Sequence, residues 1–241
     1  MACNSEPQLS QEETNQEIIS NLQQAGFPAD DIMVVDDVVY VGRDAAVSLE
    51  ASREMLEVDS SQEQYRTTNL VSRTLPVICV RGTTFTGTMS TGLNLAIQNY
   101  NQLALTFTMR RITTSTTGCS AVIQANLISG AGGVAGFPSG GRPYTSINIG
   151  TGTAAYGADV VEHVITHELG HCVGFRHSDY YNRSISCGTG GNEGSAGVGA
   201  ILIPGTPATA TRGGSIMNSC FRSVETGEFT STDRTALQYL Y

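Results

Sequence analysis

The sequence predicts an α+β fold in which a small leading segment precedes one larger domain. Three observations lead to this prediction. Most of the 22 acidic residues lie before residue 75, strand-like apolar stretches surround a helical one after it, and a second helical pattern follows at residues 159–174. Of the 241 residues, 40% are hydrophobic and 15% are charged, so the chain is expected to bury one sizeable core.

Residues 1–75 are expected to form a small, mainly helical region. Helical spacing occurs in Ile18-Ile19-Leu22 and again at residues 49–56. A β-rich run at residues 31–41 separates the two, and Gly42-Arg43-Asp44 is typical of a turn. The pattern changes at Leu75, which gives the expected boundary between residues 1–75 and residues 76–241.

The following residues have the apolar patterns of a layered α+β domain. Strands are expected where residues are β-branched or alternate in polarity, at 77–80, 105–112, 121–128 and 143–149, and a helix is expected at 92–103. The glycine-rich residues 130–141 are expected to form an irregular edge strand or a loop.

The last third of the chain contains two predicted helices separated by irregular structure. Residues 159–174 are expected to form a helix that Asp159 caps and Gly174 ends. Residues 178–214 are rich in Gly, Ser, Thr and Pro. A short helix is expected at 232–241, with Ser231 or Thr230 as its cap, and no internal repeat is found.

The charge balance argues against nucleic acid as a partner. The net charge is −9, and the 13 basic residues are scattered along the chain. No apolar run approaches the roughly 20 residues that a membrane helix needs.

Six cysteines indicate an exported protein with disulfides: Cys3, Cys79, Cys119, Cys172, Cys187 and Cys220. None forms a C-x-x-C pair, which disfavours a zinc site made of thiolates. The chain starts Met1-Ala2-Cys3 without an apolar stretch, so any export signal is expected to have been removed or replaced.

All four histidines fall between residues 163 and 177, and two of them form H-E-x-x-H in His167-Glu168-Leu169-Gly170-His171. On a helix that advances about 100° per residue, His167 and His171 face one side and can reach one ion. Glu168 lies close enough to contact a water on that ion without being a ligand. Neutral imidazoles suit Zn²⁺, and three protein ligands plus water is the catalytic arrangement.

His177 is the expected third ligand, because Gly174 permits the positive-φ turn that ends the helix and returns the chain to the metal. The full H-E-x-x-H-x-x-G-x-x-H pattern is far more specific than its first five residues. His163 lies one turn earlier and is expected to be an ordinary helix histidine or a group behind the ligands.

The stretch from His167 to His177 resembles the signature of the metzincin zinc metallopeptidases, and Ser215-Ile216-Met217-Asn218 resembles their Met-turn. Within this clan the sequence is similar to the dual-action HEIGH metallopeptidases and to myroilysin, and it shares Leu169, Gly174 and Phe175 with astacins. The resemblance implies a twisted, mostly parallel sheet with an antiparallel edge strand, an active-site helix and a small irregular C-terminal subdomain. Met217 would pack beneath the metal.

Two positions depart from the astacin pattern. Astacins have Glu after the third histidine and Tyr two places after the Met-turn methionine, whereas this chain has Ser178 and Ser219. A tyrosine zinc ligand of the astacin type is therefore absent at that position.

The resemblance implies a secreted endopeptidase that uses one catalytic Zn²⁺ and acts on polypeptides. Glu168 would take a proton from the zinc-bound water and deliver it to the leaving amine. The substrate would lie extended along an edge strand, for which residues 130–137 are the candidate.

Two other readings compete with the metallopeptidase. A serine or cysteine hydrolase needs a free histidine base, but three of the four are committed and no G-x-S-x-G pattern occurs. A binding module that zinc merely supports would lack Glu168 or have a fourth protein ligand nearby.

The expected disulfides are Cys187–Cys220, whose loops both flank the proposed cleft, and then Cys79–Cys119. Cys172, on the predicted active-site helix, would be a buried thiol.

Residues 1–75 resemble a prosegment that acts as an intramolecular inhibitor and keeps the chain latent. Metzincin relatives block the zinc with a cysteine or an aspartate, so Cys3 is one candidate and Asp44 is the alternative. Ala2-Cys3 followed by a polar tether also resembles a bacterial lipoprotein site, in which case the protein would be anchored at a cell surface. The competing interpretation of Asp44 is an ordinary turn residue, which is the more common role of a single Asp beside Gly.

Overall fold

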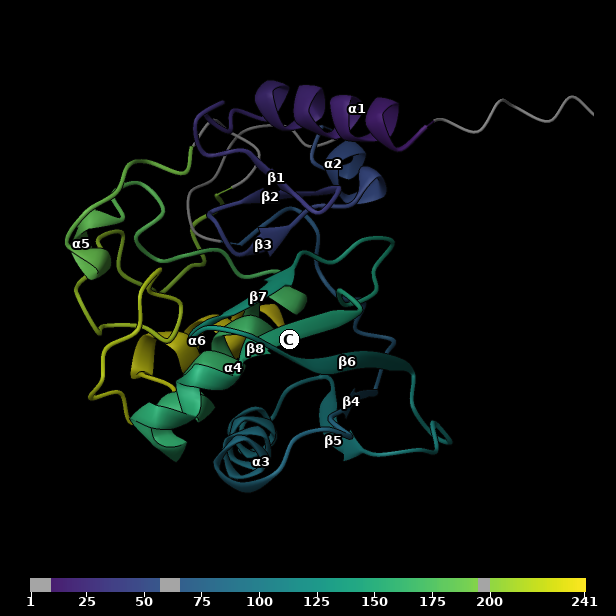
Figure 1. The fold of residues 1–241 in the computed structure, drawn as a ribbon, viewed down its shortest axis with the longest axis vertical. Coiled ribbons are helices and arrows are strands. Elements are labelled where there is room, and N and C mark those ends of the chain that lie inside the picture. Colours follow the sequence, from purple (N-terminus) through teal and green to yellow (C-terminus); the bar gives the residue numbers. More distant parts are fainter. Residues whose placement is uncertain (1–9, 57–65, 195–199) are drawn as a thin grey trace, which may run out of the picture.

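A mixed sheet runs through the molecule in the computed structural model, which describes residues 10–56, 66–194 and 200–241 (Figure 1). Among these residues it has eight strands, in the order β1-β2-β3-β7-β8-β6-β4-β5. Their bounds are β1 Met33–Val35, β2 Val38–Val41, β3 Ala45–Ala46, β4 Val77–Arg81, β5 Thr108–Ile112, β6 Ala121–Ile128, β7 Gly133–Gly136 and β8 Ser146–Gly150.

Four strands of this sheet are parallel, and β7 runs against them. β5, β4, β6 and β8 pair in parallel, and β7 pairs antiparallel with β8. Parallel neighbours need a crossover, which helix α3 (Gly87–Asn101) supplies between β4 and β5. The mixed sheet with helices confirms that part of the α+β prediction.

Helices α3 and α4 (Ala158–Cys172) lie side by side against the sheet (Figure 1). They approach so closely that a Cβ at Gly92 would lie 2.4 Å from a methyl of Val161. Ile78, Ile123 and Ile147, from β4, β6 and β8, are fully buried in the same core. Helix α4 is buried along most of its length, so its position is fixed from all sides.

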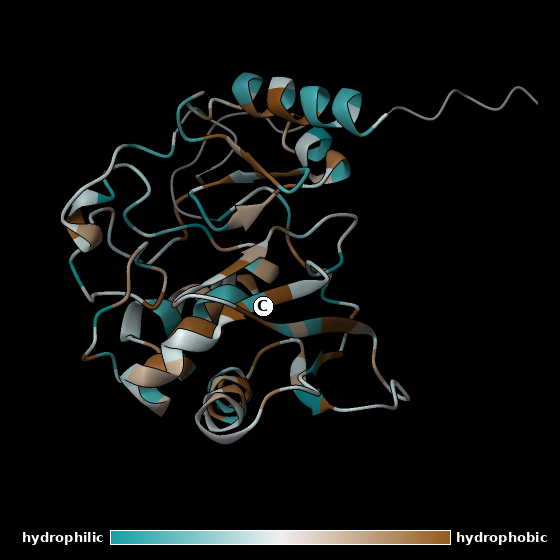
Figure 2. Cartoon of the chain, in the orientation of Figure 1, coloured by the Kyte–Doolittle hydropathy of each residue, from teal (hydrophilic) through white to brown (hydrophobic). Residues whose placement is uncertain are grey.

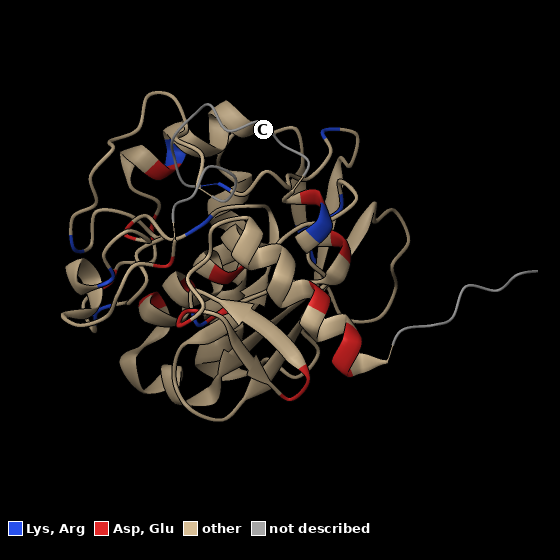
Figure 3. Cartoon of the chain, turned by 90° about the horizontal axis from the view of Figure 1, so that it is seen from above, with Lys and Arg blue, Asp and Glu red and all other residues tan. Residues whose placement is uncertain are grey.

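The N-terminal residues form a second layer with its own apolar cluster. Helix α1 (Gln11–Gln24) and helix α2 (Leu49–Glu54) pack with the β1–β2 hairpin, and Ser10 caps α1 in a capping box. Figure 2 shows α1 as mostly hydrophilic, with apolar residues confined to part of its surface. Acidic segments lie along α1, while basic residues are scattered singly (Figure 3).

The N-terminal layer is joined to the rest of the sheet through β3. Its two residues pair in parallel with β7, with Ala45 opposite Ala135 and Ala46 opposite Gly136. The amides of Ala135 and Phe137 donate to the carbonyls of Asp44 and Ala46 at 2.9 and 3.2 Å. The outer edge of β7 is therefore covered.

The C-terminal region consists of loops, the short helix α5 (Ser184–Cys187) and helix α6 (Ser231–Leu240). The disulfides Cys187–Cys220 and Cys79–Cys119 form as predicted, and Cys172 is a buried free thiol. In the part of the chain that the structure describes, no helix is both long and apolar enough to cross a membrane.

Several element boundaries differ from the predictions. The helix at 159–174 starts one residue earlier, and Gly157, not Asp159, is its N-cap; Asp159 lies in the first turn. The helix predicted at 92–103 begins already at Gly87, and the strand predicted from residue 105 begins at Thr108. Of the two proposed caps of α6, Thr230 is the one that accepts the Asp233 amide. The predicted β-run at 31–41 is a hairpin that turns at Asp36 and Asp37, both with positive φ.

Candidate metal centre

Helix α4 places His167 and His171 one turn apart on the side that faces β7. Gly174 follows the helix with φ +106°, and a Cβ there would lie 2.6 Å from the carbonyl oxygen of Asn69. Only glycine fits this combination of positive φ and close approach. The turn brings His177 back toward the helix.

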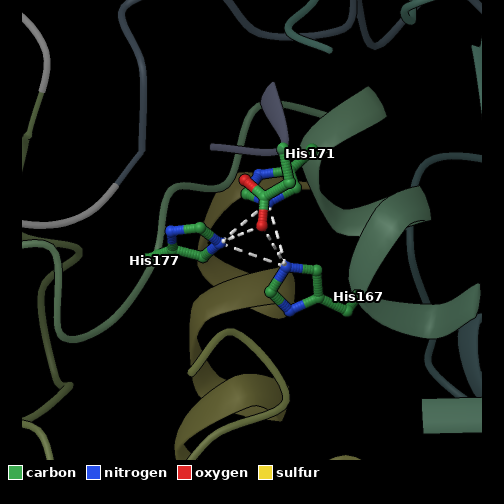
Figure 4. Close-up of side chains that lie close together, drawn as sticks. His167, His171 and His177 are labelled. Carbon is green, nitrogen blue, oxygen red and sulfur yellow. Dashed lines mark hydrogen bonds and ion pairs between the residues drawn. The ribbon is translucent and has the colours of Figure 1, made fainter. Parts of the chain in front are cut away.

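The three imidazoles point at one another around a common point (Figure 4). The Nε2 atoms are separated by 3.0 Å between His167 and His171, 3.3 Å between His171 and His177, and 3.2 Å between His167 and His177. Nitrogens that bind one tetrahedral Zn²⁺ at about 2.0–2.1 Å are about 3.3 Å apart. The spacing of the three rings therefore fits one zinc ion.

The other ring nitrogens fix the tautomers. His167 Nδ1 lies 2.8 Å from the Ile216 carbonyl and His171 Nδ1 lies 2.8 Å from the Phe175 carbonyl. His177 Nδ1 lies 2.7 Å from a carboxylate oxygen of Glu193. Because carbonyls and carboxylates only accept, each ring carries a proton on Nδ1. When the rings are neutral, as metal ligands are, the three Nε2 lone pairs face one another, and a cation between them removes their repulsion.

Asp44 completes a group of four side chains that could hold one ion. Its Oδ2 lies 3.0 Å from His177 Nε2 and its Oδ1 lies 3.7 Å from His171 Nε2. Asp44 Oδ1 is buried without a hydrogen-bond partner. It lies in a Gly42-Arg43-Asp44 turn with positive φ at the first two residues, as the sequence indicated, and the turn directs its carboxylate at the histidines.

The charged groups of this cluster stabilise one another. Burial disfavours ionised Asp44, but the neighbouring histidines lower its carboxyl pKa below the usual range. Burial also disfavours protonated His177, but Asp44 and Glu193 raise its pKa well above the usual value. Burial lowers the pKa of His171 to about 3.

Glu168 is buried beside the histidines, and its Oε2 has no hydrogen-bond partner. Burial and then the negative charge of Asp44 raise its pKa well above the usual value. A Cβ on Gly133 would lie 2.6 Å from Glu168 Oε1, so the bare backbone of β7 makes room for this carboxylate. Glu168 thus lies between strand β7 and the histidines of the candidate metal site.

Met217 packs against helix α4 at Gly170. It is buried, and a Cβ on Gly170 would lie 2.6 Å from its sulfur. The turn is held by Asp233 of α6, which accepts from the Ser215 hydroxyl and from the Ile216 amide at 2.5 and 3.0 Å. The Ile216 carbonyl lies within hydrogen-bond distance of His167 Nδ1. Helix α6 therefore helps to orient the His167 ring through this turn.

Glu193 is a functional residue that sequence reasoning missed. Besides His177, its carboxylate accepts from Arg183 Nη1 at 2.7 Å and lies 3.5 Å from Arg176 Nη2. Burial disfavours its charge, but these partners lower its pKa to about 2. Only Asp179 and Glu193 are acidic in residues 178–214, which is the signal that could have indicated it.

The two positions that depart from the astacin pattern form hydrogen bonds around this site. Ser178 accepts from the Asn218 side chain at 2.8 Å. The Ser219 hydroxyl donates to Asp179 at 2.7 Å. His163 is not part of the four-residue group, and Cys3 lies outside the described residues.

A family model matches residues 39–241, and its description is the dual-action HEIGH metallopeptidase. The chain belongs to this family. The HEIGH metallopeptidase match begins within β2, so it includes Asp44 as well as the histidines. The enzyme is therefore a zinc metallopeptidase, as predicted, and its cofactor is zinc. This family match decides against a serine or cysteine hydrolase, and also against a zinc-supported binding module, although Asp44 is a fourth possible ligand of the kind that such a module would have.

Similar solved structures include two of myroilysin and one of High choriolytic enzyme 1, a hatching enzyme zinc-protease from Oryzias latipes (medaka fish). The first myroilysin match has 16% identity, covers 72% of this chain and 93% of the other, and has a TM-score of 0.42. The second has 14% identity, covers 74% of this chain and 86% of the other, and has a TM-score of 0.40. The hatching enzyme has 16% identity, covers 71% and 92%, and has a TM-score of 0.43. No curated protein matches the chain. The assignment of this chain to the HEIGH metallopeptidases therefore depends on the family match and not on these structures.

Proposed function

We propose that this protein is a secreted zinc endopeptidase, made as a latent proenzyme, in which His167, His171 and His177 bind the metal and Glu168 is the general base. The observation that carries the proposal is the convergence of three Nε2 atoms, 3.0–3.3 Å apart, whose Nδ1 atoms all have acceptors.

The chemistry divides between the metal and the protein. Zinc, when bound, lowers the pKa of a water and polarises the substrate carbonyl. Glu168 takes the proton of that water on its unpartnered Oε2 and later delivers it to the leaving amine. Met217 fills the space beneath the helix and keeps Gly170 in place.

Substitution of Glu168 tests the general base. Glu168→Gln should keep zinc bound but abolish casein hydrolysis, because the carboxylate serves the water and not the metal. Zinc content is measured by atomic absorption, and casein hydrolysis is measured on the unprocessed chain and after limited proteolysis. More than a few per cent of the wild-type activity would refute the assignment.

Substitution of the histidines tests the ligand set. His177→Ala should lower zinc occupancy as strongly as His167→Ala does, since both rings contribute an Nε2 to the same group. Full zinc occupancy in either variant would remove that residue from the ligand set.

The proposed latency depends on residues 1–75 as an inhibitory segment ahead of a catalytic domain at 76–241. Asp44 is favoured as the residue that blocks the open zinc position, since its carboxylate lies 3.0 Å from His177 Nε2 and it comes from the N-terminal layer. Cys3, the rival candidate or a lipidation site, is tested by Cys3→Ser, which should leave an Asp44-blocked chain latent. Lipid anchorage would instead appear as detergent partitioning that Cys3→Ser removes.

The proposed substrate is a polypeptide that binds along β7, within the residues 130–137 indicated by the sequence. The amides of Ala135 and Phe137 support this proposal. If the β3 segment is removed, these amides lose their acceptors and can donate to the backbone of an extended substrate. Secretion is supported by the two disulfides.

A further inference from the structure

Residues 66–73, which we call the strap, follow the N-terminal layer in sequence but pack with the C-terminal part of the chain. Val71 is buried in the apolar cluster that also contains residues of helix α4, and its amide donates to the Tyr241 hydroxyl at 3.2 Å. The Arg73 guanidinium donates to the Leu240 carbonyl at 3.0 and 3.2 Å. The strap therefore packs with the domain that carries the metal site, although it precedes the boundary predicted from the sequence.

The strap contacts the turn that follows helix α4. The Thr67 amide donates to the Gly174 carbonyl at 2.8 Å, and the Thr67 hydroxyl donates to the Asn69 carbonyl at 2.7 Å. The Asn69 carbonyl oxygen lies against Gly174, where a Cβ would be 2.6 Å away. Arg66 adds an antiparallel β-bridge to Phe175. Thr67 is fully buried, so its contacts with the turn are shielded from solvent.

Two of the three histidines at the metal site depend on this turn. The Phe175 carbonyl lies 2.8 Å from His171 Nδ1 and so fixes the orientation of that ring. Gly174, with its positive φ, directs the chain so that His177 returns to the same point. A shift of the turn would move His177 and would also move the acceptor of His171. Groups behind metal ligands orient them, and their substitution commonly changes metal affinity about 10- to 100-fold.

We propose that Thr67 is a positioning residue for the metal site, and that the strap is an integral part of the catalytic domain. Its amide fixes the Gly174 carbonyl, and its hydroxyl fixes the Asn69 carbonyl against the same glycine. The inference rests on the proposed zinc site and refines the proposed domain boundary: the catalytic domain begins no later than Arg66, and the inhibitory segment ends before it.

Zinc affinity of the full chain, measured by competition with a chelator, tests the positioning role. Thr67→Val removes the hydroxyl, leaves the Asn69 carbonyl without its donor and should lower zinc affinity about tenfold. Thr67→Ser keeps the hydroxyl and should restore most of the affinity. Thr68→Val is the matched control, because the Thr68 hydroxyl donates to the Asn69 side chain at 2.8 Å and not to a backbone group at the turn. This control should leave zinc affinity unchanged.

Urea unfolding of the zinc-free proteins separates positioning from a general loss of stability. A Thr67→Val protein that is less stable but binds zinc as tightly as the unsubstituted chain would overturn the inference. An equal loss of zinc affinity in Thr68→Val would overturn it as well. Absence of casein hydrolysis, with zinc affinity still dependent on Thr67, would count against the peptidase alone.

Hydrogen exchange of the unsubstituted full chain gives a measurement that needs no variant to fold. In the zinc-loaded protein, the amides of Thr67 and Val71 should exchange as slowly as the Phe175 amide, because one cooperative unit opens as a whole. Removal of zinc with a chelator should speed the exchange of all three together, since coupling between two sites is reciprocal. Faster exchange of the strap than of the turn in the zinc-loaded chain, or strap exchange that ignores zinc, would overturn the inference.

Discussion

Glu193 fixes the ring of His177 from a loop that lies 16 residues further along the chain. Substitution Glu193→Gln keeps an acceptor for Nδ1 but removes the charge that Arg176 and Arg183 also face. We expect zinc affinity to fall about 10- to 100-fold, the range seen when a group behind a metal ligand is changed. Competition with a chelator of known affinity measures this change. Glu12→Gln, on the exposed side of α1, is the control and should have no effect.

Glu162 is a buried carboxyl group on α4, away from the metal. Burial raises its pKa to about 7, despite a hydrogen bond of 2.8 Å from Asn99. Since the unfolded value is about 4.3, the folded state binds this proton more strongly. The resulting stabilisation is complete below pH 4.3 and is lost as the pH rises through 7.

Glu162→Gln should therefore change how stability depends on pH. The variant and the wild type should be equally stable near pH 4, and the variant should be more stable at pH 8 by about 1–2 kcal/mol, since solvent screens part of the effect. Urea unfolding at pH 4, 6 and 8 gives the comparison, with zinc held constant. Parallel pH profiles for the two proteins would contradict the raised pKa.

At the scale of elements, Gly174 and Gly157 bracket helix α4 with similar positive φ angles, +106° and +99°. An added Cβ at Gly157 meets nothing within 4 Å, whereas at Gly174 it would lie 2.6 Å from the Asn69 carbonyl. Gly157→Ala should cost about 1–3 kcal/mol of folding free energy, because its φ of +99° and ψ of 174° lie in a region that only glycine adopts readily. Gly174→Ala should cost more and should also lower zinc occupancy, because the same turn positions His177.

Thermal unfolding and zinc content of the two variants make this comparison. Equal destabilisation of both would show that the contact at Asn69 relaxes without consequence. If Gly157→Ala lowered zinc occupancy as much as Gly174→Ala does, the effect on zinc would not be specific to the turn after α4.

The elements that the sequence predicted correctly are those fixed by local spacing. His167, His171 and His177 lie on one helix and its following turn, so 3.6-residue periodicity and one glycine suffice to bring them together. Glu193 and Asp233 could not be predicted in the same way, because each reaches the site through tertiary contacts between loops. Strand β3 was also missed, since two alanines pair only because β7 offers an edge.

At the scale of the whole molecule, two apolar clusters share one sheet. One contains buried residues from 71 to 241, and the other contains buried residues from 18 to 55 together with Phe137, which follows β7. The N-terminal layer thus packs on the strand proposed to hold the substrate. Arg183 binds the Gly42 carbonyl and Glu193 at once, which connects the Asp44 turn to the group behind His177.

Latency is the prediction that belongs to this arrangement. A substrate along β7 and the β3 segment compete for the same amides, and Asp44 and the attacking water compete for the same position on the metal. The unprocessed chain should therefore hydrolyse casein slowly, and Asp44→Ala should raise the rate at least about tenfold, since one charged ligand is removed. Asp30→Ala, at an exposed position of the same segment, is the matched control and should change nothing.

The double variant Asp44→Ala with Glu168→Gln separates this activity from a contaminant, because it should be inactive. A Cys3→Ser chain that is active while Asp44→Ala stays latent would transfer the blocking role to Cys3. Full activity of the unsubstituted chain without any cleavage would refute latency, because both the β7 edge and the metal would then be accessible with β3 and Asp44 still attached.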